Sequence, residues 1–133
     1  MNQVLYSNIV LNYLKDNHSE FLENIDFKED HSFDCSIKSI SGSRSLWIAT
    51  YNLELTLGFE NHESKCDWHI HIGASAGNNL LEELNKLTEE IDGILNNQKM
   101  FVLEEDMYLP IHGNDEEDIK HKGNVKFFNW SKI

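Results

Sequence analysis

The sequence has little cysteine, little proline and little positive charge. Its 133 residues include two cysteines, one proline and a single arginine, Arg44. Only 11 lysines and arginines oppose 23 aspartates and glutamates, which gives a formal net charge of −12. Two cysteines are too few for the disulfide framework of a small secreted domain. The acidic balance argues against direct binding to nucleic acid or to anionic membranes, and it favours a basic partner.

Long apolar runs are also missing. None approaches the ~20 residues that a membrane-spanning helix needs. Residues 1–17 lack the basic start and the uninterrupted apolar stretch of a signal peptide, so we expect a cytoplasmic protein. With a hydrophobic content of 40%, the chain has the size and composition of a single globular domain that spans residues 1–133.

Residues 47–59 show the clearest alternation of apolar and polar side chains. The odd positions from Trp47 to Phe59 are all apolar, and Asn52, Glu54 and Thr56 lie between them. Side chains of a strand point alternately to opposite faces. The pattern therefore predicts one long strand with a buried apolar face and a polar face.

A second alternating run covers residues 66–72. It places Cys66, Trp68 and Ile70 on one side, with His69 and His71 on the other. Together with residues 47–59, this run predicts a β-hairpin that leaves one face of the sheet open to solvent.

The remaining elements are predicted from helical spacing and shorter alternations. Residues 3–25 read as one amphipathic helix with a break near 17–19, and residues 33–37 as a first strand. Leu80 to Ile94 has the spacing of a second helix, capped by Asn78 or Asn79.

Two strands at residues 100–103 and 125–130, separated by a long polar connection, complete the order α-β-β-β-α-β-β. This order predicts an α+β fold in which two helices cover one face of an antiparallel sheet of about five strands.

The two cysteines share the apolar phase of their predicted strands. Cys35 is in step with Phe33 and Ile37, and Cys66 is in step with Trp68 and Ile70. We therefore expect two buried free thiols, since isolated cysteines in a cytosolic protein usually pack as small hydrophobic residues.

His69 and His71 form the strongest candidate for metal chemistry. Both imidazoles project from the same side of one strand, and a third ligand could come from Glu54, His62 or Asp67. A pair of histidines two residues apart also arises by chance in a chain with seven histidines. Exposed or partner-facing imidazoles are therefore the favoured interpretation, and no metal or other cofactor is expected.

Signatures of enzymes are weak elsewhere in the sequence. There is no Gly-x-Ser-x-Gly elbow, and the turn from Gly73 to Gly77 lacks the lysine of a phosphate-binding loop. We therefore expect a binding protein rather than an enzyme.

A window of fifteen residues after the predicted strand at 100–103 contains seven acidic residues and no lysine or arginine. Such a segment is either a solvated loop or a surface that meets a basic partner. The seven acidic residues are Glu104, Glu105, Asp106, Asp115, Glu116, Glu117 and Asp118.

The central block LELTLGFENHESKCDWHIHIG, with the later segments LLEELNKLTEEIDGIL and MFVL, resembles the small acidic immunity proteins encoded beside bacterial polymorphic toxins. These include proteins of contact-dependent growth inhibition systems. The resemblance covers about half of the chain and lies in pattern, length and charge. It implies an inhibitor that binds a cognate toxin in the cytoplasm, often a basic nuclease.

On this interpretation the polar face of the predicted sheet and the acidic window form the surface that contacts the toxin. The predicted contact residues are Asn52, Glu54, Thr56, His69, His71, Glu104, Glu105, Asp106, Asp115, Glu116, Glu117 and Asp118.

Two alternatives remain open at this point. One is a small metal-dependent enzyme in which His69 and His71 bind the metal and Glu54 acts as a base. The other is a regulatory interaction domain without a toxin partner. The oligomeric state is not predicted.

Overall fold

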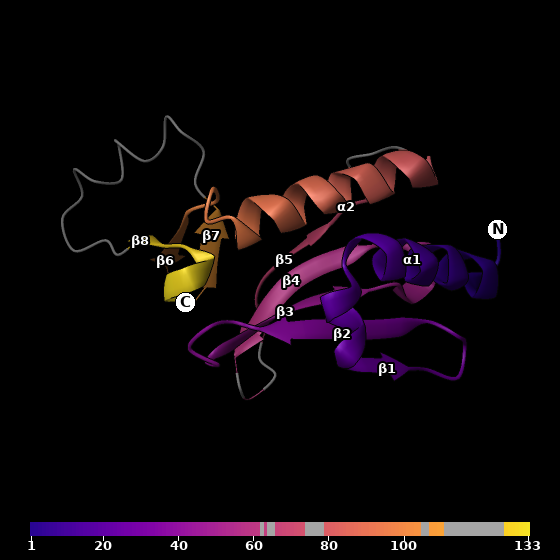
Figure 1. The fold of residues 1–133 in the computed structure, drawn as a ribbon, viewed down its shortest axis with the longest axis horizontal. Coiled ribbons are helices and arrows are strands. Elements are labelled where there is room, and N and C mark those ends of the chain that lie inside the picture. Colours follow the sequence, from indigo (N-terminus) through magenta and orange to yellow (C-terminus); the bar gives the residue numbers. More distant parts are fainter. Residues whose placement is uncertain (62, 64–65, 74–78, 105–106, 111–126) are drawn as a thin grey trace.

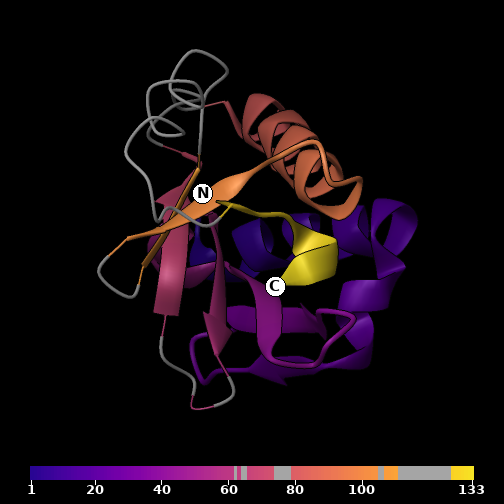
Figure 2. The ribbon, with the colours of Figure 1, turned by 90° about the vertical axis from the view of Figure 1, so that its left-hand side faces the viewer.

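A computed structural model describes residues 1–61, 63, 66–73, 79–104, 107–110 and 127–133. It confirms the α+β class, with a five-stranded antiparallel sheet of order β1-β2-β3-β4-β5 and two helices on one face (Figures 1 and 2). The strands of this sheet are β1 (Ile25–Phe27), β2 (Phe33–Lys38), β3 (Arg44–Ala49), β4 (Thr56–Asn61) and β5 (Cys66–His71). The helices are α1 (Gln3–Asn17) and α2 (Leu80–Leu95).

The C-terminal strands form a sheet of their own. Strands β6 (Phe101–Glu104), β7 (Met107–Pro110) and β8 (Phe127–Phe128) pair in the order β7-β6-β8. The expectation that residues 100–103 and 125–130 add to the main sheet is therefore wrong. All five strands of the main sheet come from residues 25–71, because the predicted long strand is two strands and β1 follows the first helix closely.

The segment Trp47 to Phe59 is not one strand. It contains the end of β3, a 3-10 turn at Tyr51–Leu53 and most of β4. Asn52 and Leu53 have left-handed φ angles of 55° and 59°, and they reverse the chain so that β4 runs antiparallel to β3.

The turn also changes which side chains face the core. In β3 the side chains that face the core are even-numbered, Leu46 and Ile48, whereas in β4 they are Leu57 and Phe59. The prediction that Trp47, Ala49 and Tyr51 share one buried face with the later apolar residues of this segment is therefore wrong. Trp47 and Ala49 lie on the opposite side of the sheet, where Ala49 is still buried, and Tyr51 lies exposed in the 3-10 turn.

The N-terminal helix ends earlier than predicted. It begins after Asn2, whose side chain accepts a hydrogen bond of 2.8 Å from the Leu5 amide, and it ends at Asn17. A 3-10 turn follows at Ser19–Glu23, as the predicted break near residues 17–19 suggested. Ile25, expected in the helix, instead begins β1.

The second helix agrees with its prediction. Asn79 caps α2 by accepting hydrogen bonds from the Leu81 and Glu82 amides. Leu84, Leu87, Ile91 and Ile94 form its buried face, as their spacing predicts. Among the described residues, no helix has the length and apolar character needed to cross a bilayer.

The core lies between the helices and the inner face of the main sheet, and the small sheet contributes to it. The rings of Phe59, Trp68 and Phe101 pack together with centroids 5.1 to 5.3 Å apart, so strand β6 joins the same core as β4 and β5. Cys35 is buried there as a free thiol, as predicted.

Cys66 departs from its prediction and is exposed. A register shift between Phe59 and Glu60 pairs Trp68 with Phe59 but Cys66 with Glu60. This bulge turns Cys66 away from the core side that Trp68 faces.

Candidate functional site

The candidate site is the face of the main sheet that points away from both helices (Figures 1 and 2). We call it the open face. Strand register places its side chains in three rows across β2, β3, β4 and β5. The rows are Asp34, Ala49, Thr56 and His71; Ser36, Trp47, Gly58 and His69; and Lys38, Ser45, Glu60 and Cys66.

The indole of Trp47 lies across Gly58 in the middle row. A Cβ atom at residue 58 would stand 2.8 Å from Cζ2 of Trp47 and 2.4 Å from the carbonyl oxygen of Trp68. Glycine is therefore the residue that lets the indole lie close to β4. Nε1 of Trp47 is buried and has no hydrogen-bond partner within the part of the chain that the structure describes.

A hollow of about 360 Å³ opens on the β1 side of Trp47. Its lining includes the small residues Ser36 and Ala49, and Ala49 is 2% exposed. We call it the acidic hollow, since three carboxylates and one ammonium group line it. The lining residues are Asp26, Lys28, Asp34, Ser36, Trp47, Ala49, Tyr51 and Glu60.

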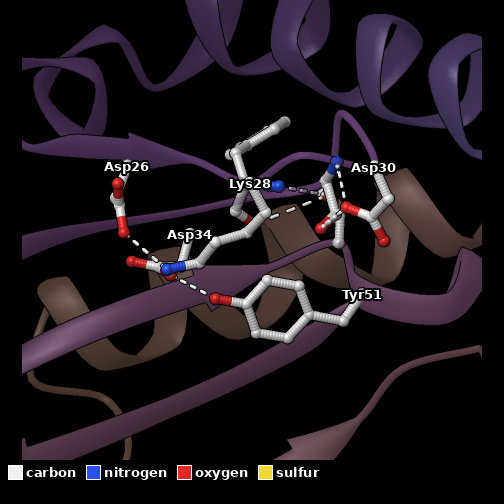
Figure 3. Close-up of polar contacts among 8 residues, drawn as sticks. Asp26, Lys28, Asp30, Asp34 and Tyr51 are labelled. Atoms are coloured by element: carbon white, nitrogen blue, oxygen red, sulfur yellow. Dashed lines mark hydrogen bonds and ion pairs between the residues drawn. The ribbon is translucent and has the colours of Figure 1, made fainter.

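One cation and two carboxylates meet at the rim of the acidic hollow (Figure 3). Nζ of Lys28 lies 2.5 Å from Oδ2 of Asp26 and 3.5 Å from Oδ2 of Asp34. The hydrogen bond to Asp26 raises the pKa of Lys28, so that lysine stays charged at neutral pH. Tyr51 donates a hydrogen bond from its hydroxyl to Asp34.

The Tyr51 hydroxyl remains a donor over the physiological pH range. Partial burial, with the hydrogen bond to Asp34 as a second cause, raises the pKa of Tyr51 to about 12. Tyr51 is 39% exposed beside the hollow and is therefore accessible to a partner.

Glu60 is the third carboxylate of the acidic hollow, and no cation among the described residues pairs with it. The side chain is partly buried and makes neither an ion pair nor a hydrogen bond with any other residue that the structure describes. Burial raises its pKa, and the charge of Asp34 raises it further. A partner that brings a positive charge to this carboxylate would relieve both effects.

The histidines occupy the β5 side of Trp47. His69 and His71 are exposed on one side of β5, as predicted, with ring centroids 5.1 Å apart. Nδ1 of His71 contacts the Glu54 carboxylate and lies 3.1 Å from Oγ1 of Thr56. Nδ1 of His69 lies 3.5 Å from Sγ of Cys66.

A second hollow, of about 330 Å³, lies over these histidines and extends to Trp47 and Tyr51. No group of three histidine, cysteine, aspartate or glutamate side chains is placed to hold a metal ion among the described residues. His62, one of the three candidates for a third ligand, lies outside those residues. The arrangement suits contact with another molecule through aromatic, imidazole and carboxylate groups.

The structure brings several of the predicted contact residues together. Thr56, His69 and His71 share the open face, and Glu54 joins them through His71. Asn52 was expected on the polar face of a strand. It instead lies exposed in the 3-10 turn between β3 and β4.

The predicted acidic window is mostly not described. Glu104 ends strand β6. Glu105, Asp106, Asp115, Glu116, Glu117 and Asp118 lie outside the described residues.

The acidic hollow was missed by the sequence interpretation. Asp26 directly follows the predicted helix of residues 3–25, and Glu60 lies between the two predicted strands of the hairpin, but the structure places them in β1 and β4. The polar phase of Asp34 between Phe33 and Cys35 is a sequence signal that places Asp34 on the face opposite the core.

A buried carboxyl outside the open face gives a first testable prediction. Glu83 is 8% exposed and accepts a 3.2 Å hydrogen bond from the Tyr6 hydroxyl. Burial raises the pKa of Glu83 despite that hydrogen bond, and the charge of Glu54 adds to the effect. The folded state therefore favours the protonated carboxyl. The stability that this preference contributes is fully present below pH 4.5, the ordinary pKa of glutamate. It is lost as pH rises through the raised pKa of Glu83 in the folded state.

We expect Glu83→Gln to gain stability relative to the natural chain as pH rises above the raised pKa of Glu83, because glutamine does not ionise. Denaturant unfolding at several pH values measures the difference. Glu82→Gln, an exposed position in the same helical turn, is the control and should show a smaller pH dependence. If the stability advantage of Glu83→Gln over the natural chain shrinks as pH rises, the idea that a charge is buried at this site is contradicted.

Comparison of the chain with protein-family models, with curated proteins and with solved structures finds no match.

Proposed function

We propose that this chain is an immunity-type inhibitor that binds a basic toxin domain through the open face, in the cytoplasm of the cell that produces it. The observation that carries the proposal is the chemistry of that face. Asp26, Asp34 and Glu60 lie around two aromatic side chains, Trp47 and Tyr51, on the side of the sheet that neither helix covers. Aromatic anchors within a charged rim are typical of binding hot spots.

Charge supports a basic partner. The net charge of −12 attracts a positively charged protein over several ångströms, and it repels nucleic acid. An inhibitor of this kind acts by occupying the toxin's active site or substrate groove, so it needs no turnover of its own. His69 and His71 serve as contact residues in this proposal.

The direct test uses the toxin domain that the proposal requires. The proposal predicts that the gene immediately upstream encodes a large secreted protein, and the probe is the C-terminal domain of that protein. We expect it to bind the purified chain in calorimetry and to stop killing cells when the two are co-expressed. Absence of both binding and protection would reject the proposed function.

A matched pair of variants locates the contact surface. Thr56→Arg places a long cation on the open face beside His71, and it should weaken toxin binding by at least about tenfold. Asn85→Arg makes the same change of charge on the exposed side of α2 and should bind like the natural chain. Equal losses for both variants would show that charge alone matters and that the open face is not the contact surface.

Salt dependence supplies a separate prediction for the same complex. Raising the ionic strength from about 0.1 M to about 1 M shortens the Debye length from about 10 Å to about 3 Å, so the association rate constant should fall on the order of tenfold. Stopped-flow fluorescence of the tryptophans measures the rate. An association rate that does not change with salt would contradict electrostatic steering.

A further inference from the structure

The described residues that line the acidic hollow carry more negative than positive charge. Asp26, Asp34 and Glu60 supply three carboxylates, and Lys28 supplies one ammonium group, which already bridges Asp26 and Asp34 at the rim. The remaining net charge is about −2 when all four groups are ionised. Glu60 is the carboxylate without a partner among the described residues, and burial disfavours its charge.

The walls of the hollow are aromatic. Trp47 lies on one side with its ring held against Gly58, and Tyr51 lies on another with its hydroxyl fixed by Asp34. Aromatic faces attract cations, and a planar guanidinium can stack on them while its N–H groups bind carboxylates. The volume of about 360 Å³ is near the lower end of small-molecule pockets, so it suits one side chain rather than a large ligand.

We propose that the acidic hollow receives one arginine side chain of the protein partner, with its guanidinium bound by Glu60 and Asp34 and lying against Trp47 and Tyr51. This inference rests on the proposed function, because the partner supplies the arginine. Arginine fits better than lysine, since its flat fork of donors can reach two carboxylates at once and is more weakly hydrated than an ammonium group.

The test uses short peptides rather than the toxin. The probes are acetyl-Gly-Arg-Gly-amide, the same peptide with lysine, and the same peptide with citrulline, which keeps the shape of arginine but has no charge. Binding is followed by the shift of the Trp47 indole N–H signal in nuclear magnetic resonance spectra, assigned with Trp47→Phe. We expect saturable binding of the arginine peptide, with the citrulline peptide weaker by about tenfold or more and the lysine peptide in between.

Glu60→Gln provides the decisive variant. It should weaken binding of the arginine peptide by at least about fivefold. It should still fold, because Glu60 has no partner within the described chain to lose. Asp34→Asn should act in the same direction, and Asp92→Asn, an exposed position on α2, should bind like the natural chain.

The outcomes separate this inference from the proposed function. Equal binding of the arginine and citrulline peptides, or no effect of Glu60→Gln, would overturn the arginine site. If the toxin domain still bound and Thr56→Arg still weakened it, the proposed function would stand without that site. If the arginine peptide binds but the toxin domain does not, the hollow remains an arginine site and the proposed inhibitor function is rejected.

Discussion

Leu55→Asp should abolish the cooperative fold. Leu55 is 0% exposed and lies immediately before β4, where its carbonyl oxygen accepts a 2.9 Å hydrogen bond from the Ile72 amide. Removing a buried leucine typically costs about 2 to 5 kcal/mol, and an unpaired buried charge costs several more. The sum is comparable with the total stability of a domain, about 5 to 15 kcal/mol.

Glu54→Ala is the matched control for Leu55→Asp. Glu54 is the preceding residue, its side chain is 43% exposed, and it contacts His71 on the open face. The loss of such an exposed contact should cost less than about 1 kcal/mol. Circular dichroism during heating measures both variants. A cooperative transition for Leu55→Asp within a few degrees of the natural chain would show that residue 55 is not in the core.

Gly58→Ala should lower the free energy of unfolding by about 2 to 3 kcal/mol, which is the upper part of the usual range for overpacking. The new Cβ would meet a backbone oxygen and Cβ of His69 as well as the Trp47 ring, at 2.4 to 2.8 Å. A flexible side chain could move away from a methyl group, but the carbonyl of Trp68 belongs to the paired strand and can do so only if the strand shifts.

Gly93→Ala is the control with the opposite sign. Gly93 lies in α2. Apart from its chain neighbours and the nearby helix backbone, no atom of the described residues stands within 4 Å of the position that the new methyl group would take, so alanine should stabilise the helix by about 0.5 to 1 kcal/mol. Chemical denaturation followed by tryptophan fluorescence measures both glycine variants. If Gly58→Ala is as stable as the natural chain, the close packing of the Trp47 indole against β4 is contradicted.

The fold class could be predicted because helical spacing and strand alternation are averaged over many residues. Leu84, Leu87 and Ile91 identify α2, and Phe33 with Cys35 identifies β2. The break inside residues 47–59 could not be read from the sequence. Tyr51 and Leu53 continue the alternation through the turn, and neither glycine nor proline marks it.

The candidate site was predicted in part. The spacing of His69 and His71 is enough to place both imidazoles on one side of a strand. Trp47 could not be assigned to that side from the sequence. The turn at Tyr51–Leu53 decides which face its side chain takes relative to β4, and Asn52 is the one residue that hints at this turn. Asp26 was hidden for a different reason: a strand of three residues directly after a helical pattern is too short to have a period of its own.

The brevity of β1 has a consequence for self-association. A sheet with an uncovered face and a free edge is a template on which further copies can stack, and proteins often limit this with short or charged outer strands. Strand β1 offers three residues at that edge, with Asp26 within it and Lys28 directly after it. A second molecule of the same acidity would find few amide groups to pair with and a repulsive surface beside them. Edge-to-edge growth through β1 is therefore disfavoured even in concentrated solution, while an oppositely charged protein keeps access to the open face.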